Sequence, residues 1–281
     1  MSTQLLIYEK TAPVTNQRHR DWSIKKGADC TFAKHVNAVP LTAVEFSAAA
    51  AEHAIVFTGT AGAYMPTVIL GMRDRQNLYL NEDGSWRAKY LPAFIRRYPF
   101  VFASSDDGKR FTLCLDEAFS GCNQAGLGER LFDAEGTRTQ YLEGVLNFLQ
   151  QYQGQFQLTQ AFCKKLHELD LLEPMQAQIT LPTGEKVALT GFMAVNRDRL
   201  KKLSAEKLAA LVQANELELI YIHLQSIRNI SVMADRLSGT LSPDRQAESV
   251  GESTAQASPD ATDNASGTDR GKKKLSAAQA T

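Results

Sequence analysis

The sequence has few of the features that usually identify a membrane protein, a secreted protein or a nucleic-acid-binding protein. No apolar run approaches the roughly 20 residues that span a bilayer, so we do not expect an integral membrane protein. The first residues lack the positive charge and the roughly 7–15 apolar residues of a secretory signal, which predicts a cytoplasmic location. Lys and Arg total 31, as do Asp and Glu, so no net charge attracts nucleic acid.

Motifs for cofactors, metals and activated nucleophiles are also lacking. The chain contains no GxxxxGK[ST], no clean GxGxxG and no GxSxG. Its four cysteines are scattered without a CxxC pair, and we expect them to be free thiols. Cys163 and His167 have the spacing of two ligands on one helix face, but no HExxH or similar element supplies the remaining ligands. We therefore predict no metal site and no bound cofactor.

What the chain does contain predicts an α+β fold, with a mostly antiparallel sheet packed by helices and a C-terminal helical segment. Compact apolar runs bounded by glycine, proline or polar turns are typical of strands, and short links between successive strands favour antiparallel pairing. On this basis strands are expected at 54–58, 67–72, 77–80, 100–103 and 111–115, followed by a hairpin over 178–195 that turns at 182–184.

Helices are predicted where apolar residues recur with a period near 3.6. An alanine-rich helix should begin after Thr42 as its N-cap, and a shorter one should cover 91–98 with Pro92 in its first turn. A helix over 141–156 and another over 158–169 are expected, with Gly154 dividing or kinking the pair. Two more helices should form the C-terminal segment. The first is capped by Ser204 and ends near Asn215, and the second spans about 217–230.

Composition divides the chain into three parts. Residues 1–35 read as an irregular lead-in, and residues 36–237 carry the apolar periodicity of an α+β domain. Residues 238–281 are rich in Ser, Ala, Thr, Asp and Gly, with almost no large apolar side chains. Such a segment cannot bury enough apolar surface to offset the entropy of ordering, so we expect a disordered tail.

The most distinctive stretch is 86–100, where arginines and aromatic residues lie together. A guanidinium offers a planar set of donors for a carboxylate and also stacks on aromatic rings, which predicts a binding surface. In the alternative interpretation the helix is only pinned to the sheet, and one arginine pairs with a buried carboxylate after the strand at 111–115. The candidate binding residues are Trp86, Arg87, Tyr90, Arg96, Arg97, Tyr98, Asp116 and Glu117.

Several motifs between 36 and 237 resemble the bacterial SapC-like family, which is distinct from the peptide-transport permease of the same name. The longest is Trp86-Arg-Ala-Lys-Tyr-Leu-Pro-Ala-Phe-Ile-Arg-Arg-Tyr-Pro-Phe. Shorter ones are Pro40-Leu-Thr-Ala-Val-Glu-Phe, Val68-Ile-Leu-Gly-Met-Arg, the strand at 77–81, Leu113-Cys-Leu-Asp-Glu, Gly191-Phe-Met-Ala-Val-Asn and Tyr221-Ile-His-Leu-Gln-Ser. Asn196 stands where such sequences often carry aspartate, which disfavours a catalytic acid there. The resemblance implies a link to cell-surface assembly or to outer-membrane uptake systems.

Two hypotheses of function follow. In the first, the protein is a non-catalytic accessory protein that binds a peptide or protein partner through the arginine and aromatic residues of 86–98. In the second, it is an enzyme that modifies a peptide or an amino sugar, with Asp116 or Glu117 and Arg96 or Arg97 in one pocket. An arginine and Asp116 that converge in a deep pocket would favour the enzyme.

Overall fold

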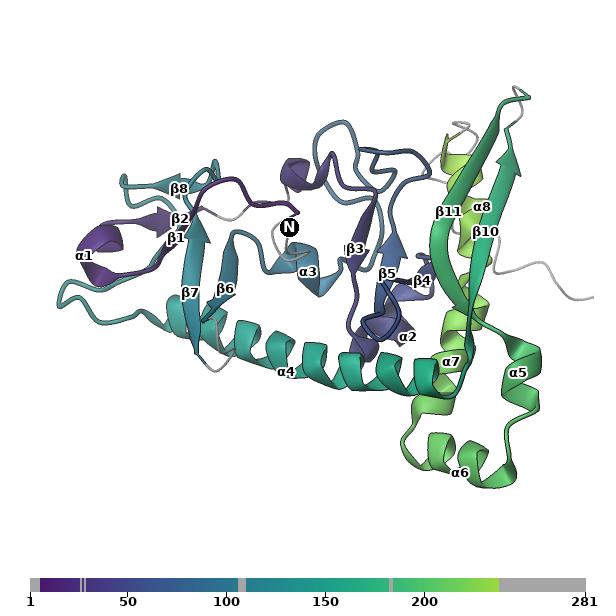
Figure 1. Cartoon of the computed structure of the whole chain (residues 1–281). Coiled ribbons are helices and arrows are strands. Elements are labelled where there is room, and N and C mark those ends of the chain that lie inside the picture. Colours follow the sequence, from purple (N-terminus) through teal and green to yellow (C-terminus); the bar gives the residue numbers. More distant parts are fainter. Residues whose placement is uncertain (1–5, 26, 28, 106–109, 182–183, 238–281) are drawn as a thin grey trace, which may run out of the picture. The chain divides into compact units, whose positions relative to one another are not determined.

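The computed structural model describes residues 6–25, 27, 29–105, 110–181 and 184–237. These residues belong to one compact unit, and the tail expected to be disordered lies outside them. Three antiparallel sheets pack against helices, and a run of helices ends the described chain (Figure 1). The predicted α+β class is confirmed.

The largest sheet has five strands in the order β10-β11-β4-β5-β3, and every neighbouring pair is antiparallel. Residues 178–195 form the predicted hairpin, which starts earlier than expected; its turn at 182–183 lies outside the described residues. The central strands β4 and β5 are almost fully buried, as their continuous apolar runs predict. The strands are β3 (Ala38–Pro40), β4 (Ile55–Thr58), β5 (Met65–Ile69), β10 (Leu172–Thr180) and β11 (Lys186–Val195).

The strand predicted at 77–80 is wrong. This segment forms turns, with a single bridge between Leu80 and Trp86. The side chain of Asn77 accepts a hydrogen bond from the Tyr79 N–H at 2.9 Å and donates to the Ala33 carbonyl at 3.0 Å. Such local side-chain bonds satisfy the backbone without a ladder, so the apolar residues here do not need a strand partner.

Two smaller sheets involve the N-terminal segment. One has the order β1-β7-β6 and the other β8-β2-β9. Residues 1–35, predicted as an irregular lead-in, thus contribute two short strands and the helix α1 (Asn16–His19). The strands are β1 (Thr11–Pro13), β2 (Ser23–Ile24), β6 (Phe100–Ser104), β7 (Phe111–Asp116), β8 (Cys122–Asn123) and β9 (Glu129–Arg130).

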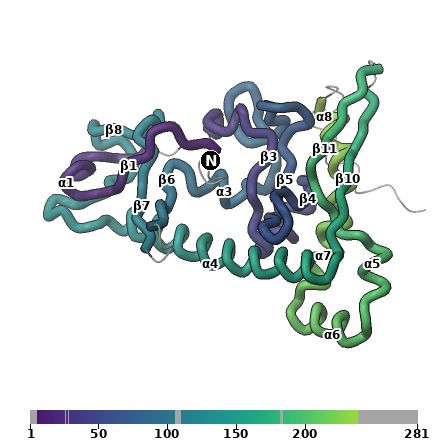
Figure 2. Tube along the Cα trace, in the orientation of Figure 1, coloured from purple at the N-terminus to yellow at the C-terminus, as the bar shows by residue number. Residues whose placement is uncertain are grey.

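A single long helix, α4 (Gln140–Glu168), replaces the two helices predicted on either side of Gly154. Thr139 caps it by accepting a hydrogen bond from the Leu142 N–H. Glycine costs about 1 kcal/mol in a helix interior, and the flanking Gln and Leu residues are strong helix formers that offset this cost. The helix therefore continues through Gly154, and Figure 2 shows α4 without a break.

α4 contributes to two apolar cores. Its N-terminal half places Leu142 and Leu149 in the smaller core, with Phe100 and Leu115 of the β6–β7 pair. Its C-terminal half enters the larger core, which contains β4, β5 and much of the C-terminal helical segment. Phe162, Cys163 and Leu166 are the buried residues that α4 gives to that core. We call these the small core and the large core.

Residues 43–49 form a short helical segment in place of the longer alanine-rich helix expected at 42–53. It consists of a 3-10 turn (Ala43–Glu45) and α2 (Phe46–Ala49). Thr42 caps the turn as predicted, and the Glu45 side chain completes a capping box. α3 (Ala93–Arg96) begins after Pro92, close to the prediction.

Four helices end the described chain: α5 (Arg197–Lys201), α6 (Ala205–Gln213), α7 (Glu216–Ser226) and α8 (Asn229–Leu237). Ser204 caps α6, as predicted. The last helix, expected over 217–230, is divided into α7 and α8. The Ser226 hydroxyl accepts a hydrogen bond from the Ile55 N–H, and the Asn229 amide donates to the Ala50 and His53 carbonyls. These bonds tie the junction to neighbouring backbone and explain the division.

No helix among the described residues combines the length and the apolar character needed to cross a membrane.

Candidate functional site

Three of the predicted binding residues, Arg96, Arg97 and Tyr98, line an open pocket of about 380 Å³ between α3 and the N-terminal half of α4. Arg96 is exposed at this pocket. Its guanidinium lies 5.9 Å from the centre of the Tyr90 ring and 5.5 Å from that of Phe148. We call this site the arginine pocket; its full lining is Arg96, Arg97, Tyr98, Phe100, Gln140, Tyr141, Gly144, Val145 and Phe148.

Arg97 has a different environment from Arg96, as expected for adjacent residues on a helix. It is only 5% exposed, and its guanidinium lies 4.3 Å from the centre of the Phe94 ring and 5.1 Å from that of Tyr152. The Tyr8 ring lies on it as well, at 5.6 Å. Burial raises the pKa of the Tyr8 phenol, although Arg97 opposes the shift. Arg97 thus joins α3 to α4 and to the N-terminal segment.

Tyr90, Trp86 and Arg87 lie beside the pocket and do not line it. The Tyr90 hydroxyl donates to the buried Glu45 carboxylate at 2.7 Å, and its pKa is raised by burial and by that carboxylate. The Trp86 indole donates to the Tyr90 carbonyl at 2.9 Å and stacks on Tyr79. The Arg87 N–H donates to the Tyr79 carbonyl. These contacts support the position of Tyr90 under Arg96.

Asp116 is fully buried, and its carboxylate closes a loop between β7 and the N-terminal segment. It accepts hydrogen bonds from the Glu9 and Lys10 N–H groups, both at 2.8 Å, and from the Ala118 N–H at 3.1 Å. The Tyr98 hydroxyl donates to the same carboxylate at 3.3 Å. Asp116 is therefore next to a pocket residue but is not part of the pocket lining.

Glu117 lies in the turn directly after β7 and has partners different from those of Asp116. It accepts two hydrogen bonds from Arg18 and is also within ion-pair distance of Lys10 and His19. These bonds, those to Arg18 first, lower its pKa to about 2. The carboxylates of Asp116 and Glu117 are thus held by the N-terminal segment. The alternative prediction, in which one arginine pairs with a buried carboxylate such as Asp116 or Glu117, did not include these partners from the N-terminal segment.

Asp116→Asn tests whether this carboxylate is structural. The amide NH₂ would face backbone donors that now meet an oxygen, so the free energy of unfolding should fall by about 2 kcal/mol. Urea denaturation followed by circular dichroism measures the change. Asp198→Asn, at an exposed aspartate on α5, is the matched control and should change stability little. Equal midpoints for the Asp116 variant and the wild type would contradict the structural role.

The α4 side of the arginine pocket was not predicted from the sequence. Tyr141, Val145 and Phe148 share one helical face, and that periodicity predicted burial only. Gly144 lies on the same wall, where a Cβ atom would meet nothing within 4 Å. Alanine in place of an interior helix glycine would stabilise the helix by roughly 0.5–1 kcal/mol. A glycine within a predicted helix is therefore a feature of the sequence that could have indicated a pocket at this wall.

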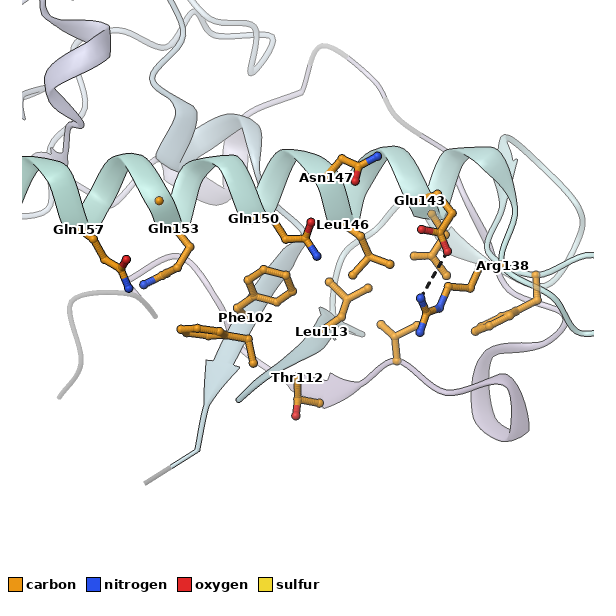
Figure 3. Close-up of a pocket in the computed structure, with 15 residues that line it drawn as sticks. Phe102, Thr112, Leu113, Arg138, Glu143, Leu146, Asn147, Gln150, Gln153 and Gln157 are labelled. Carbon is orange, nitrogen blue, oxygen red and sulfur yellow. Dashed lines mark hydrogen bonds and ion pairs between the residues drawn. The ribbon is translucent and has the colours of Figure 1, made fainter. Parts of the chain in front are cut away.

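A second and larger cavity, of about 800 Å³, lies where α4 faces the β6–β7 pair (Figure 3). Three glutamines of α4 line it, together with Phe102 of β6 and Phe111 of β7. Gly154 lies among the glutamines, and a Cβ atom at this position would again have no neighbour within 4 Å. We call this the glutamine groove; it contains none of the residues predicted from the sequence.

Within the described ranges, no group of three or more His, Cys, Asp or Glu side chains is arranged to hold a metal ion. Cys163 is buried, which raises the pKa of its thiol to about 12, and His167 packs its ring on Tyr64.

A family model described as SapC matches residues 14–233. The chain belongs to the SapC family. The SapC match begins before the motifs that carry the resemblance, so it takes in the helix α1 and the strand β2 of the N-terminal segment. It also contains α3, α4 and the β6–β7 pair, and with them both cavities. No curated protein and no solved structure matches the chain.

Proposed function

We propose that this SapC-family protein is a non-catalytic accessory protein of the cytoplasm that binds a peptide or protein partner in the arginine pocket, in the service of cell-surface assembly or outer-membrane uptake. One observation carries the proposal. The exposed guanidinium of Arg96 lies within cation–π distance of two aromatic rings at an open pocket. These rings restrict the movement of its planar set of donors in advance, so a partner loses less entropy on binding.

The chemistry of the pocket favours a ligand with a carboxylate beside an apolar group. Arg96 has no ion pair among the residues that the structure describes, so an incoming carboxylate meets an uncompensated cation. Phe100, Val145 and Phe148 provide apolar wall next to it. Peptides combine these two features at an acidic side chain or at a C-terminus. Arginine and aromatic residues also dominate the energetic centres of protein interfaces.

The enzyme alternative depends on a carboxylate in the same pocket. The Asp116 carboxylate already accepts three backbone N–H groups and the Tyr98 hydroxyl, and it lies outside the lining. A general base must reach the proton that it abstracts. The arrangement of Asp116 supports a role in holding the N-terminal segment and so favours the binding hypothesis.

Selection of random displayed peptides on the immobilised protein tests the proposal. We expect enrichment of peptides with a carboxylate next to a large apolar residue, measured afterwards by fluorescence anisotropy. Arg96→Ala should weaken their binding about tenfold or more, a loss in the range found for interface arginines. Arg197→Ala, at an exposed arginine of α5, is the matched control and should leave the affinity unchanged.

Gly144→Ala gives a second test at the same pocket. The added methyl group enters the pocket without touching the fold, so the melting temperature should stay the same or rise while peptide affinity falls. Selected peptides that bind both variants as tightly as the wild type would overturn the assignment of the pocket. Failure to enrich any peptide would overturn the peptide proposal itself.

A further inference from the structure

The glutamine groove has two walls of different chemistry. Gln150, Gln153 and Gln157 project from α4 to the side on which Phe102 lies (Figure 3). Their spacings of three and four residues place them on one helical face, in a row about 10 Å long. On the facing wall the rings of Phe102 and Phe111 lie 5.7 Å apart.

The amide wall offers hydrogen bonds that the described residues do not use. None of the three glutamine side chains has a hydrogen-bond partner within the part of the chain that the structure describes. Each primary amide carries an acceptor oxygen and two N–H donors, so the row can both donate to and accept from one ligand. A ligand group that is also both donor and acceptor, such as a hydroxyl, matches it best.

The groove carries no net charge to select an ion. Arg138 and Glu143 lie at one end and form an ion pair at 3.3 Å, so their charges compensate each other. The remaining polar lining consists of amides and the hydroxyl of Thr112. A neutral ligand therefore fits the groove better than an acidic or a basic one.

The aromatic wall, together with the amides, matches the two kinds of surface on a sugar ring. Phe102 is paired with Leu113 in the register of β6 and β7, and both line the groove. The side chains of Phe102 and Leu113 therefore lie on the same face of the sheet, and this face forms much of the wall. A sugar ring presents an apolar C–H face for the phenyl rings and hydroxyls around its rim for the amides.

Gly154 supports a role for the open space. It lies in the glutamine row, and a Cβ atom there would meet nothing within 4 Å. Alanine would stabilise the helix, so the fold gains nothing from glycine at this position. The missing side chain leaves the α4 backbone accessible between Gln153 and Gln157.

We infer that the glutamine groove binds a neutral oligosaccharide, whose hydroxyls contact the glutamine amides and whose C–H faces lie on Phe102 and Phe111. The site is separate from the arginine pocket, and the inference does not depend on the peptide-binding proposal.

Isothermal titration of the full chain with maltotetraose, cellotetraose, xylotetraose and tetra-N-acetylchitotetraose tests the inference. At least one of these neutral probes should bind. Gln150→Met removes an amide at nearly constant volume and should weaken that binding about tenfold, as should Gly154→Ala, which narrows the groove. Gln151→Met, at an exposed glutamine of the same helix outside the groove, is the matched control and should bind like the wild type.

The outcomes separate this site from the arginine pocket. Gly144→Ala should leave oligosaccharide binding intact, because Gly144 lines only the other cavity. Absence of binding by all four neutral probes to the folded wild type would overturn the inference. So would a bound probe whose affinity is the same in the Gln150 and Gly154 variants, or a groove that takes displayed peptides and no sugar.

Discussion

Glu45→Gln is expected to lower the free energy of unfolding by about 3 kcal/mol. The Glu45 side chain is 4% exposed, and each of its two oxygens accepts two hydrogen bonds. One oxygen binds the N–H and the hydroxyl of Thr42, at 2.9 and 2.7 Å. The other binds the Tyr90 hydroxyl and the Ala93 N–H, both at 2.7 Å. An amide NH₂ on either side would face one backbone N–H, of Thr42 or of Ala93, as a buried contact between donors, and it would force the neighbouring hydroxyl to reverse its role. A buried donor left unsatisfied costs about 1–3 kcal/mol.

Chemical denaturation of the full chain measures this effect, and two variants calibrate it. Tyr90→Phe removes only one of the four bonds and should cost about 1 kcal/mol. Glu206→Gln, in the exposed first turn of α6, should change stability within about 0.5 kcal/mol. If Glu45→Gln and Glu206→Gln had the same midpoint, Glu45 could not be the link between the capping box and α3. Because Ala93 begins α3, loss of this link should also displace Arg96.

Acidification should destabilise the protein between about pH 6.5 and pH 4, with a large contribution from His223. Burial lowers the pKa of this imidazole from 6.5 to about 4. Its Nδ1–H donates to the Ile55 carbonyl at 2.9 Å, and its Nε2 accepts from the Val195 N–H at 3.1 Å, so the neutral ring is fully bonded. The unfolded chain binds the proton first, so stability is complete above pH 6.5 and is lost as pH falls to 4. The shift corresponds to about 3 kcal/mol.

His223→Gln separates this histidine from the rest of the acid response. The glutamine amide can keep one donor and one acceptor in place but does not titrate. The difference in unfolding free energy between wild type and variant should therefore change by about 3 kcal/mol in favour of the variant between neutral pH and pH 4. His53, whose pKa burial also lowers to about 4, contributes equally to both proteins. The exposed His167→Gln serves as control, and a parallel pH dependence of wild type and His223→Gln would contradict the assignment.

The strands that could be predicted were those whose partners lie close in sequence. The β4–β5 and β6–β7 pairs and the β10–β11 hairpin have apolar runs with short connections, and the structure contains all three. The pairing of β1 with β7 joins Thr11 to Asp116, and no local pattern at residues 11–13 indicates it. The continuity of α4 could not be predicted from helix propensity alone, because both halves of the helix pack on apolar cores and this packing offsets the cost of Gly154.

Only the α3 side of the arginine pocket could be predicted from the sequence. Arginines next to aromatic residues indicated a cation stacked on rings, and Arg96 has that environment. Which ring would stack could not follow from 86–100 alone, since Phe148 comes from a helix that starts some forty residues later. The glutamine groove was missed because exposed glutamines on a helix are the ordinary composition of a solvent face. Only the position of the β6–β7 pair opposite them makes a cavity.

The sharing of α4 between the small core and the large core has a practical consequence. The chain has two tryptophans, and Trp22 packs on the small core while Trp86 packs on the large one. Each core therefore contains its own native fluorophore, and the emission of each indole reports on a different core. The backbone hydrogen bonds of α4 run without interruption from one core to the other. The fluorescence of the two tryptophans therefore reports on two cores that are joined by one continuous helix.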